Sequence, residues 1–215
     1  MNKIVLGLII ANVLISYKGF NNIDFFNKYK FQIGSIKGGD KLRMVSSGFL
    51  HADWMHLGFN MYALYLFGKI VAVDFGNIYF VLIYFGSLLA GSMYSFGQNK
   101  KDDYYSAIGA SGAVSGIVFS AIILYPEMEL IMFPIPIPLP GYVFGIGYLV
   151  YSIYGMKNKV GNIGHSAHLG GAMGGFVLTL LLRPSVVSNN TVMIVVMGVI
   201  IAGLLFFGDK LRLNQ

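Results

Sequence analysis

The sequence of 215 residues contains no cysteine and few charged side chains. The absence of cysteine excludes a disulfide framework, a thiolate nucleophile and a metal site with thiolate ligands, although it says nothing about compartment. Charged residues make up 11% of the chain and hydrophobic residues 56%, whereas a soluble domain usually has about 25% charged residues. We therefore expect an all-α polytopic membrane protein.

The sequence also lacks the motifs of several other functional classes. None of the four histidines stands in a His-Glu-x-x-His pattern or has a glutamate nearby, which disfavours a metalloprotease. The aspartates fall in loops or at helix ends, so the paired intrahelical carboxylates of an aspartyl protease are missing. The sequence shows no internal repeat of the kind expected in a transporter, which disfavours that function. We expect no metal and no cofactor.

The positive charge is modest, with a net charge of +6, and most of the basic residues lie in the connections outside the apolar runs. This distribution suits contacts with lipid headgroups rather than a nucleic-acid surface. The expected partners are the lipid bilayer and transmembrane proteins, and the oligomeric state is not predicted.

Seven apolar runs are separated by turn-like residues. The first could be a signal peptide, but no small-residue cleavage site follows it, so a retained helix is favoured. We expect one membrane-embedded domain, 1–215, with helices at about 4–16, 55–73, 78–96, 111–125, 139–156, 164–182 and 192–207.

Two connections stand out. The segment 18–50 interleaves aromatic residues with lysines, which fits a stretch lying in the membrane interface or a soluble loop with its own small core. The segment 134–140 has alternate prolines, which cannot continue a helix. We expect it to be an extended linker along the membrane surface.

The helix that begins at Ser111 is short. Its fifteen positions, ending before Pro126, span roughly 22 Å, less than the ~30 Å hydrocarbon core. Non-helical backbone at that depth is tolerated only when it is buried in protein or faces water. Ser111 is therefore predicted to lie inside the membrane and beside water.

Polar side chains are energetically costly inside a membrane, and several others are predicted to lie on the same side of the bilayer as Ser111. His56, Asn60, Ser111 and His168 all lie near the starts of the second, fourth and sixth helices, which run in the same direction. His168 stands in a stripe of small residues, at i, i+4, i+7 and i+11: Gly164, His168, Gly171 and Gly175. Glycine faces let helices approach closely, so the imidazole can reach the serine hydroxyl. Alternatively, the glycines serve packing alone and the serine bonds to its own helix.

These residues resemble three motifs of the rhomboid family of intramembrane serine proteases. Gly109-Ala-Ser111-Gly112 resembles its G-x-S-G nucleophile motif, and Ala167-His168 with Gly171 and Gly175 is similar to its A-H-x-x-G-x-x-x-G helix. The run from His51 through His56 to Asn60 resembles its H-x-x-x-x-H-x-x-x-N element. The likeness covers about 43–182, and the helix at 192–207 matches only members with an added C-terminal span.

The resemblance implies a six-helix rhomboid-like bundle plus that additional helix. It implies that Ser111 is the nucleophile and His168 the general base, without a carboxylate. It assigns stabilisation of the oxyanion to His56, Asn60 and the backbone N–H of Ser111, with Gly109 leaving room for the scissile carbonyl. It assigns structural support to Arg43, Gly112, Gly171 and Gly175, and it makes the helix at 139–156 the gate for the substrate.

The sequence departs from the family pattern at two positions. Leu42 precedes Arg43 where many members have tryptophan. Ser115 stands four residues after the nucleophile, where the family often has an aromatic ring that packs on the histidine. Neither change removes a reacting group, but the second leaves open how His168 is held.

The predicted function is that of a serine endopeptidase that cleaves transmembrane segments of membrane proteins. The alternative is a catalytically silent binder or chaperone of transmembrane helices. The resemblance implies a multi-pass protein of a prokaryotic inner or plasma membrane, with the site open to the extracytoplasmic side. That orientation leaves only Lys3, Lys69 and Arg183 of the 15 Lys and Arg inside, whereas the positive-inside rule predicts the opposite orientation.

Overall fold

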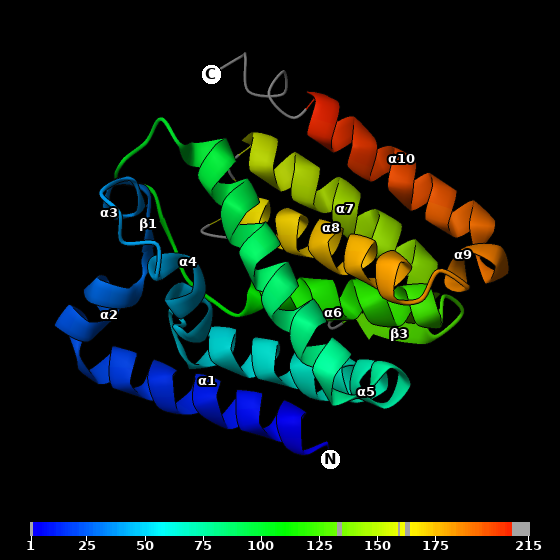
Figure 1. Cartoon of the computed structure of the whole chain (residues 1–215), viewed down its shortest axis with the longest axis horizontal. Coiled ribbons are helices and arrows are strands. Elements are labelled where there is room, and N and C mark those ends of the chain that lie inside the picture. The colour runs from blue at the N-terminus through cyan, green and yellow to red at the C-terminus, as the bar shows by residue number, and fades with distance from the viewer. Residues whose placement is uncertain (1, 133–134, 159, 162–163, 208–215) are drawn as a thin grey trace.

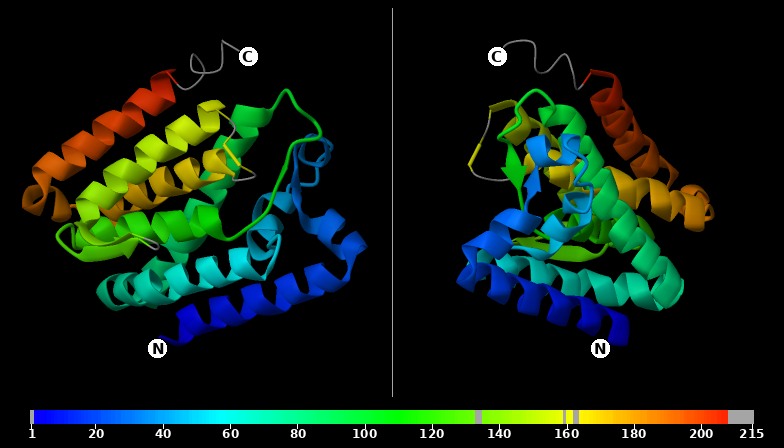
Figure 2. Two further views of the ribbon diagram at one scale, coloured as in Figure 1. Left: turned by 180° about the vertical axis from the view of Figure 1, so that it is seen from behind. Right: turned by 60° about the vertical axis from the view of Figure 1, so that its left-hand side comes forward.

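A computed structural model describes residues 2–132, 135–158, 160–161 and 164–207, and its long helices lie side by side in a bundle (Figure 1). Helices α1 and α10 lie on opposite sides of the bundle in both further views (Figure 2). The long helices are α1 (Lys3–Asn21), α5 (Trp54–Asn99), α6 (Ser111–Leu124), α7 (Gly141–Asn158), α8 (His165–Leu182) and α10 (Thr191–Phe207).

Within the described ranges, three helices are long and apolar enough to cross a membrane, namely α1, α5 and α8. Two shorter apolar helices, 111–124 and 191–203, accompany them. Helix α1 continues to Asn21, beyond the predicted end at 16, and packs along α5.

Helix α5 contains both the second and the third predicted helices. Gly76 interrupts it with φ of 78° and ψ of 170°, a conformation that glycine adopts without the steric cost of a side chain. The chain therefore turns sharply inside α5, at the predicted break. Directly after α8, the Arg183 guanidinium pairs with the Asp74 carboxylate and also donates to the Asp74 carbonyl at 2.6 Å. This pair fastens the turn to the far end of α8.

Helix α6 lies at the centre of the bundle and packs against both α5 and α8, which also pack against each other. Every residue from Gly112 to Ile123 is buried, and its 14 residues make it short for a spanning helix. Glycines carry its contact with α8: a Cβ added to Gly171 would overlap the carbonyl of Gly112, and one added to Gly175 would overlap that of Gly116. The predicted glycine-to-glycine contact of these helices is present.

The segment 18–50 has the small core that one of the two interpretations predicted. Phe31, Ile33 and Ile36 are buried together, against Tyr105 and Phe96. Strand β1 (Phe31–Gln32) pairs antiparallel with β2 (Ser106–Ala107). The segment also contains the short helices α2 (Ile23–Tyr29), α3 (Ile33–Lys37) and α4 (Arg43–Ser46) and the 3-10 turn η1 (Ser47–Phe49).

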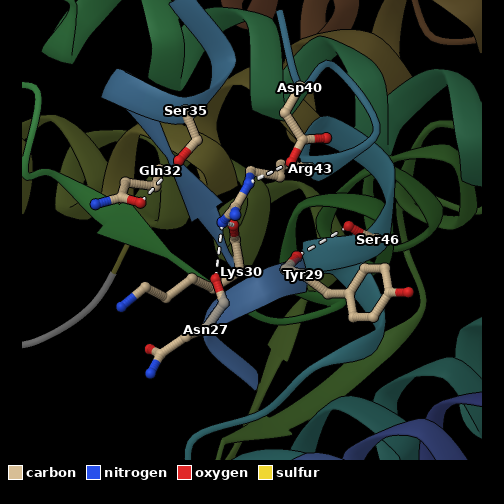
Figure 3. A network of polar contacts seen from close by, with 8 residues as sticks. All are labelled: Asn27, Tyr29, Lys30, Gln32, Ser35, Asp40, Arg43 and Ser46. Atoms are coloured by element: carbon tan, nitrogen blue, oxygen red, sulfur yellow. Dashed lines mark hydrogen bonds and ion pairs between the residues drawn. The ribbon is translucent and has the colours of Figure 1, made fainter. Parts of the chain in front are cut away.

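Arg43 ties the parts of this segment together (Figure 3). Its Nη1 donates to the carbonyl oxygens of Asn27 at 2.8 Å and Lys30 at 3.0 Å, and its Nε donates to the Asp40 carboxylate at 2.8 Å. Since α4 leads through η1 towards α5, the guanidinium holds the end of α2 against the approach to the site. This geometry suits the structural role expected of Arg43.

The segment with alternate prolines is extended as predicted, but it is not a lone linker. Strand β4 (Ile135–Pro140) pairs antiparallel with β3 (Glu129–Met132), so the two form a hairpin. Pro134 lies outside the described residues. Sequence reasoning missed the pairing because prolines disfavour strands except at sheet edges, and a two-stranded hairpin consists only of edges. After α8, the short helix α9 (Val186–Asn189) leads into α10.

Candidate active site

Ser111 and His168 touch. The Nε2 atom of His168 lies 2.6 Å from Oγ of Ser111, and both residues are half-buried. Ser111 is the first residue of α6, and His168 lies in the first turn of α8. The distance is within the range that a general base needs to take a proton from a hydroxyl group.

Gly109 shapes the turn before Ser111. Its φ is +121°, a value that side chains disfavour, and its N–H donates to the Ser47 carbonyl at 3.0 Å. A Cβ at this position would lie 2.9 Å from Nε2 of His56 and 3.5 Å from Oγ of Ser111. Gly109 therefore keeps open the space between the His56 imidazole and the serine hydroxyl.

His56 presents a donor to this space. The N–H of Ala52 donates to Nδ1 of His56 at 3.4 Å, so the ring proton of the neutral imidazole belongs on Nε2. The backbone N–H of His56 is capped by the Asp53 carboxylate at 2.7 Å, which fixes the start of α5. The structure thus brings His56 to the site beside Ser111.

Asn60 lies one turn further along α5 and is buried. Its side-chain amide donates to the His56 carbonyl at 3.0 Å, which leaves a second amide hydrogen for another acceptor. Among the described residues, Asn60 and His56 make no direct hydrogen bond to Ser111. They stand on the neighbouring helix at the same end of the bundle.

His51 supports the loop before Ser111, a role that sequence reasoning missed. Its Nε2 accepts the N–H of Ala110 at 3.3 Å, so Nδ1 carries the proton and donates to Oγ of Ser16 at 2.8 Å. The Ser16 hydroxyl in turn donates to the Phe49 carbonyl at 2.9 Å. The buried ring therefore links α1 to the turn that presents the serine. The sequence did contain a signal for this role, because His51 is the first histidine of the H-x-x-x-x-H-x-x-x-N element.

The network of His51 predicts a pH dependence of stability. Burial, assisted by the neighbouring His56, lowers the pKa of His51 to about 3, whereas an unfolded histidine titrates near 6.5. Between these values the unfolded state binds more protons, so this contribution is complete above about pH 6.5 and is lost as the pH falls towards 3. We expect the melting temperature in detergent to fall over that range, and to fall less steeply in His51→Gln. Parallel curves for the two proteins would contradict this role.

Two further features surround the serine. A cavity of about 30 Å³ adjoins Ser111, enough for about two water molecules, and the hydroxyl-bearing residues Ser47, Ser92 and Ser95 help to line it. The Tyr148 ring of α7 lies nearly parallel to the His168 ring, with centroids 6.3 Å apart. Sequence reasoning missed Tyr148, because nothing in the pattern of α7 distinguishes it from the other tyrosines of that helix.

The sequence model of the Rhomboid domain matches residues 38–185, more than half of the chain. The chain belongs to the rhomboid family. This rhomboid is 32% identical over 186 residues to RHOMBOID-like protein 12, mitochondrial, of Arabidopsis thaliana, covering 79% of this chain and 55% of the relative. It is 32% identical over 138 residues to Rhomboid protein 1, mitochondrial, of Saccharomyces cerevisiae, covering 63% and 40%.

A bacterial relative is the Putative rhomboid protease YdcA of Bacillus subtilis, 30% identical over 151 residues, covering 68% of this rhomboid and 69% of YdcA. The chain spans about half the length of the first two relatives. Together with its apolar helices, membership of the family makes this rhomboid a multi-pass integral membrane protein. RHOMBOID-like protein 12 and Rhomboid protein 1 are mitochondrial, another relative from Arabidopsis thaliana is chloroplastic, and YdcA is bacterial, so the relatives do not support the prokaryotic plasma membrane predicted from the sequence.

Proposed function

We propose that this rhomboid is an intramembrane serine endopeptidase that cleaves transmembrane segments of membrane proteins. The observation that carries the proposal is the 2.6 Å contact between Nε2 of His168 and Oγ of Ser111. A serine that only bonded to its own helix would not need an imidazole from another helix. Two relatives are named as rhomboid proteases, the Putative rhomboid protease YdcA and the Rhomboid protease GluP.

The proposed mechanism has two halves. Oγ of Ser111 attacks the scissile carbonyl carbon while His168 takes the hydroxyl proton, and the C–N bond then breaks as His168 gives that proton to the departing amine. A water molecule next attacks the acyl group, His168 accepts a proton from it, and Ser111 leaves with that proton. The cavity beside Ser111 is a source of this water.

The tetrahedral intermediates carry a negative oxygen that needs donors already in place. The Nε2–H of His56, the free amide hydrogen of Asn60 and the backbone N–H of Ser111 are the donors we assign to it. The substrate helix must unwind locally to expose its carbonyl, so helix-weakening residues near the cleavage site are expected. Ser111 and His168 lie where α6 and α8 begin, and we assign this end of the bundle to the extracytoplasmic side, as the family resemblance implies.

Labelling of the serine tests the proposal. We expect a fluorophosphonate to modify the full chain in detergent at Ser111, as located by mass spectrometry, and to block cleavage of a model transmembrane substrate. Ser111→Ala removes both signals. Ser120→Ala, which deletes a buried hydroxyl elsewhere in α6, keeps both. Folded protein that neither reacts with the reagent nor cleaves would overturn the proposal and favour a silent binder of transmembrane helices.

A further inference from the structure

Resting on the proposed function, we infer that Tyr148 of α7 is the positioning residue for His168. It replaces, from a different helix, the aromatic ring that the chain lacks at Ser115. The rings of Tyr148 and His168 are nearly parallel, with an interplanar angle of 16° and centroids 6.3 Å apart. This separation falls within the range in which stacked aromatic rings attract each other. The imidazole is therefore bounded by Tyr148 on one face while its Nε2 meets Ser111.

A chain of hydrogen bonds fixes the tyrosine ring. Oγ of Ser115 donates to the Ser111 carbonyl at 2.7 Å, and a serine hydroxyl has one hydrogen to give. The Tyr148 hydroxyl, 2.6 Å from Oγ of Ser115, must then be the donor in that contact. Tyr148 is thus tied, through Ser115, to the backbone of the residue proposed as the nucleophile. A single network holds the serine turn and the ring that faces the histidine.

The placement of Ser115 and Tyr148 explains how a ring from α7 can replace an aromatic residue at position 115. Ser115 is buried, one helical turn after Ser111, so a ring there would face the same space. Phe119 and Phe144 flank the Tyr148 ring, with centroids 5.7 and 6.1 Å from it. The small serine leaves room for the tyrosine and provides the acceptor for its hydroxyl. Positions 115 and 148 therefore share one aromatic site beside the imidazole.

Removal of the ring separates positioning from other roles. In Tyr148→Leu we expect kcat to fall about ten- to a hundredfold, the cost of a misplaced catalytic group, with KM little changed. The rate constant for fluorophosphonate labelling of Ser111 should fall by a similar factor. That small reagent does not need the entry of a substrate helix, so its slower reaction excludes a role in substrate access alone. Tyr154→Leu, an exposed tyrosine of the same helix, is the matched control and keeps both rates.

Two further sets of variants make the test independent of folding losses. Tyr148→Phe breaks the hydrogen bond between Tyr148 and Ser115 and should slow labelling by about fivefold. Ser115→Ala breaks that bond and also the bond to the Ser111 carbonyl, so it should slow labelling at least as much. The double variant should then cost no more than Ser115→Ala alone. The double variant Ser115→Tyr with Tyr148→Leu returns a ring to the shared site and should label faster than Tyr148→Leu.

The outcomes distinguish the two proposals. If the wild-type protein labels at Ser111 while Tyr148→Leu and Tyr148→Phe label at the wild-type rate, the positioning role is overturned and the proposed function stands. If labelling falls in Tyr148→Leu but the returned ring gives no recovery, the shared aromatic site is overturned. If the folded wild-type protein neither labels nor cleaves, the proposed function itself fails.

Discussion

Replacing His168 by alanine should lower kcat for cleavage of a model transmembrane substrate by at least about 10³-fold, because nothing else then takes the proton of Ser111. The imidazole is 2.6 Å from that hydroxyl. In the part of the chain that the structure describes, no other imidazole or carboxylate forms a hydrogen bond with Ser111. The His168 side chain is only half-buried, so its truncation should leave the melting temperature close to that of the wild type. Single-turnover cleavage in detergent, with a thermal melt of the same sample, measures both quantities.

The matched control removes the other imidazole of α8. His165 is buried, and its Nε2 donates to the Val160 carbonyl at 3.0 Å. Glutamine can make the same donation, so we expect His165→Gln to retain cleavage within about tenfold. Equal losses in the two variants, or full activity in His168→Ala, would contradict the assignment of His168 as the base.

The parts of the fold that depend on local pattern could be predicted from the sequence. Apolar runs bounded by turn residues located the long helices, and the break at Gly76 fell where the turn-like residues stood. The candidate site could also be predicted from the sequence, but for a different reason. Alternating helix directions place the starts of α5, α6 and α8 at one end, and glycine faces allow two of them to touch. The contact of Ser111 with His168 follows from those two facts.

The parts that depend on long-range packing could not be predicted. Tyr148 meets His168 because of the rotation and depth of α7, which no spacing within α7 determines. The linkage of His51 to Ser16 joins segments that only the folded chain brings together. Strand β4 contains the alternate prolines and pairs with β3, whereas the sequence pattern alone predicts a linker there. In each case, the missing information concerns the partner rather than the residue itself.

Gly109→Ala should lower kcat by at least about 10²-fold, although it adds a single methyl group far smaller than any catalytic side chain. The added carbon would lie 2.8 and 2.9 Å from Cε1 and Nε2 of His56, closer than real Cβ contacts allow. Either the imidazole moves away from Ser111 or the turn before the serine shifts. Both changes disturb the space that we assign to the oxyanion.

A second glycine separates this steric effect from backbone strain. Gly39 has a similar φ of +106°, but no atom lies within 4 Å of an added Cβ. Gly39→Ala should therefore lower the melting temperature through strain and leave kcat unchanged. If both alanines reduce kcat equally, the loss comes from backbone strain and the open space at Gly109 has no special role.

The displaced group can be identified with a double variant. Removing one oxyanion donor typically costs about 10²–10³ in kcat, so His56→Ala alone should lie in that range. If Gly109→Ala acts by pushing His56 aside, it should cost little more once His56 is alanine, since truncation also removes the clash. Full additivity of the two losses would instead show that the methyl group acts through the serine turn, and it would move the effect of Gly109 from the oxyanion donors to the nucleophile.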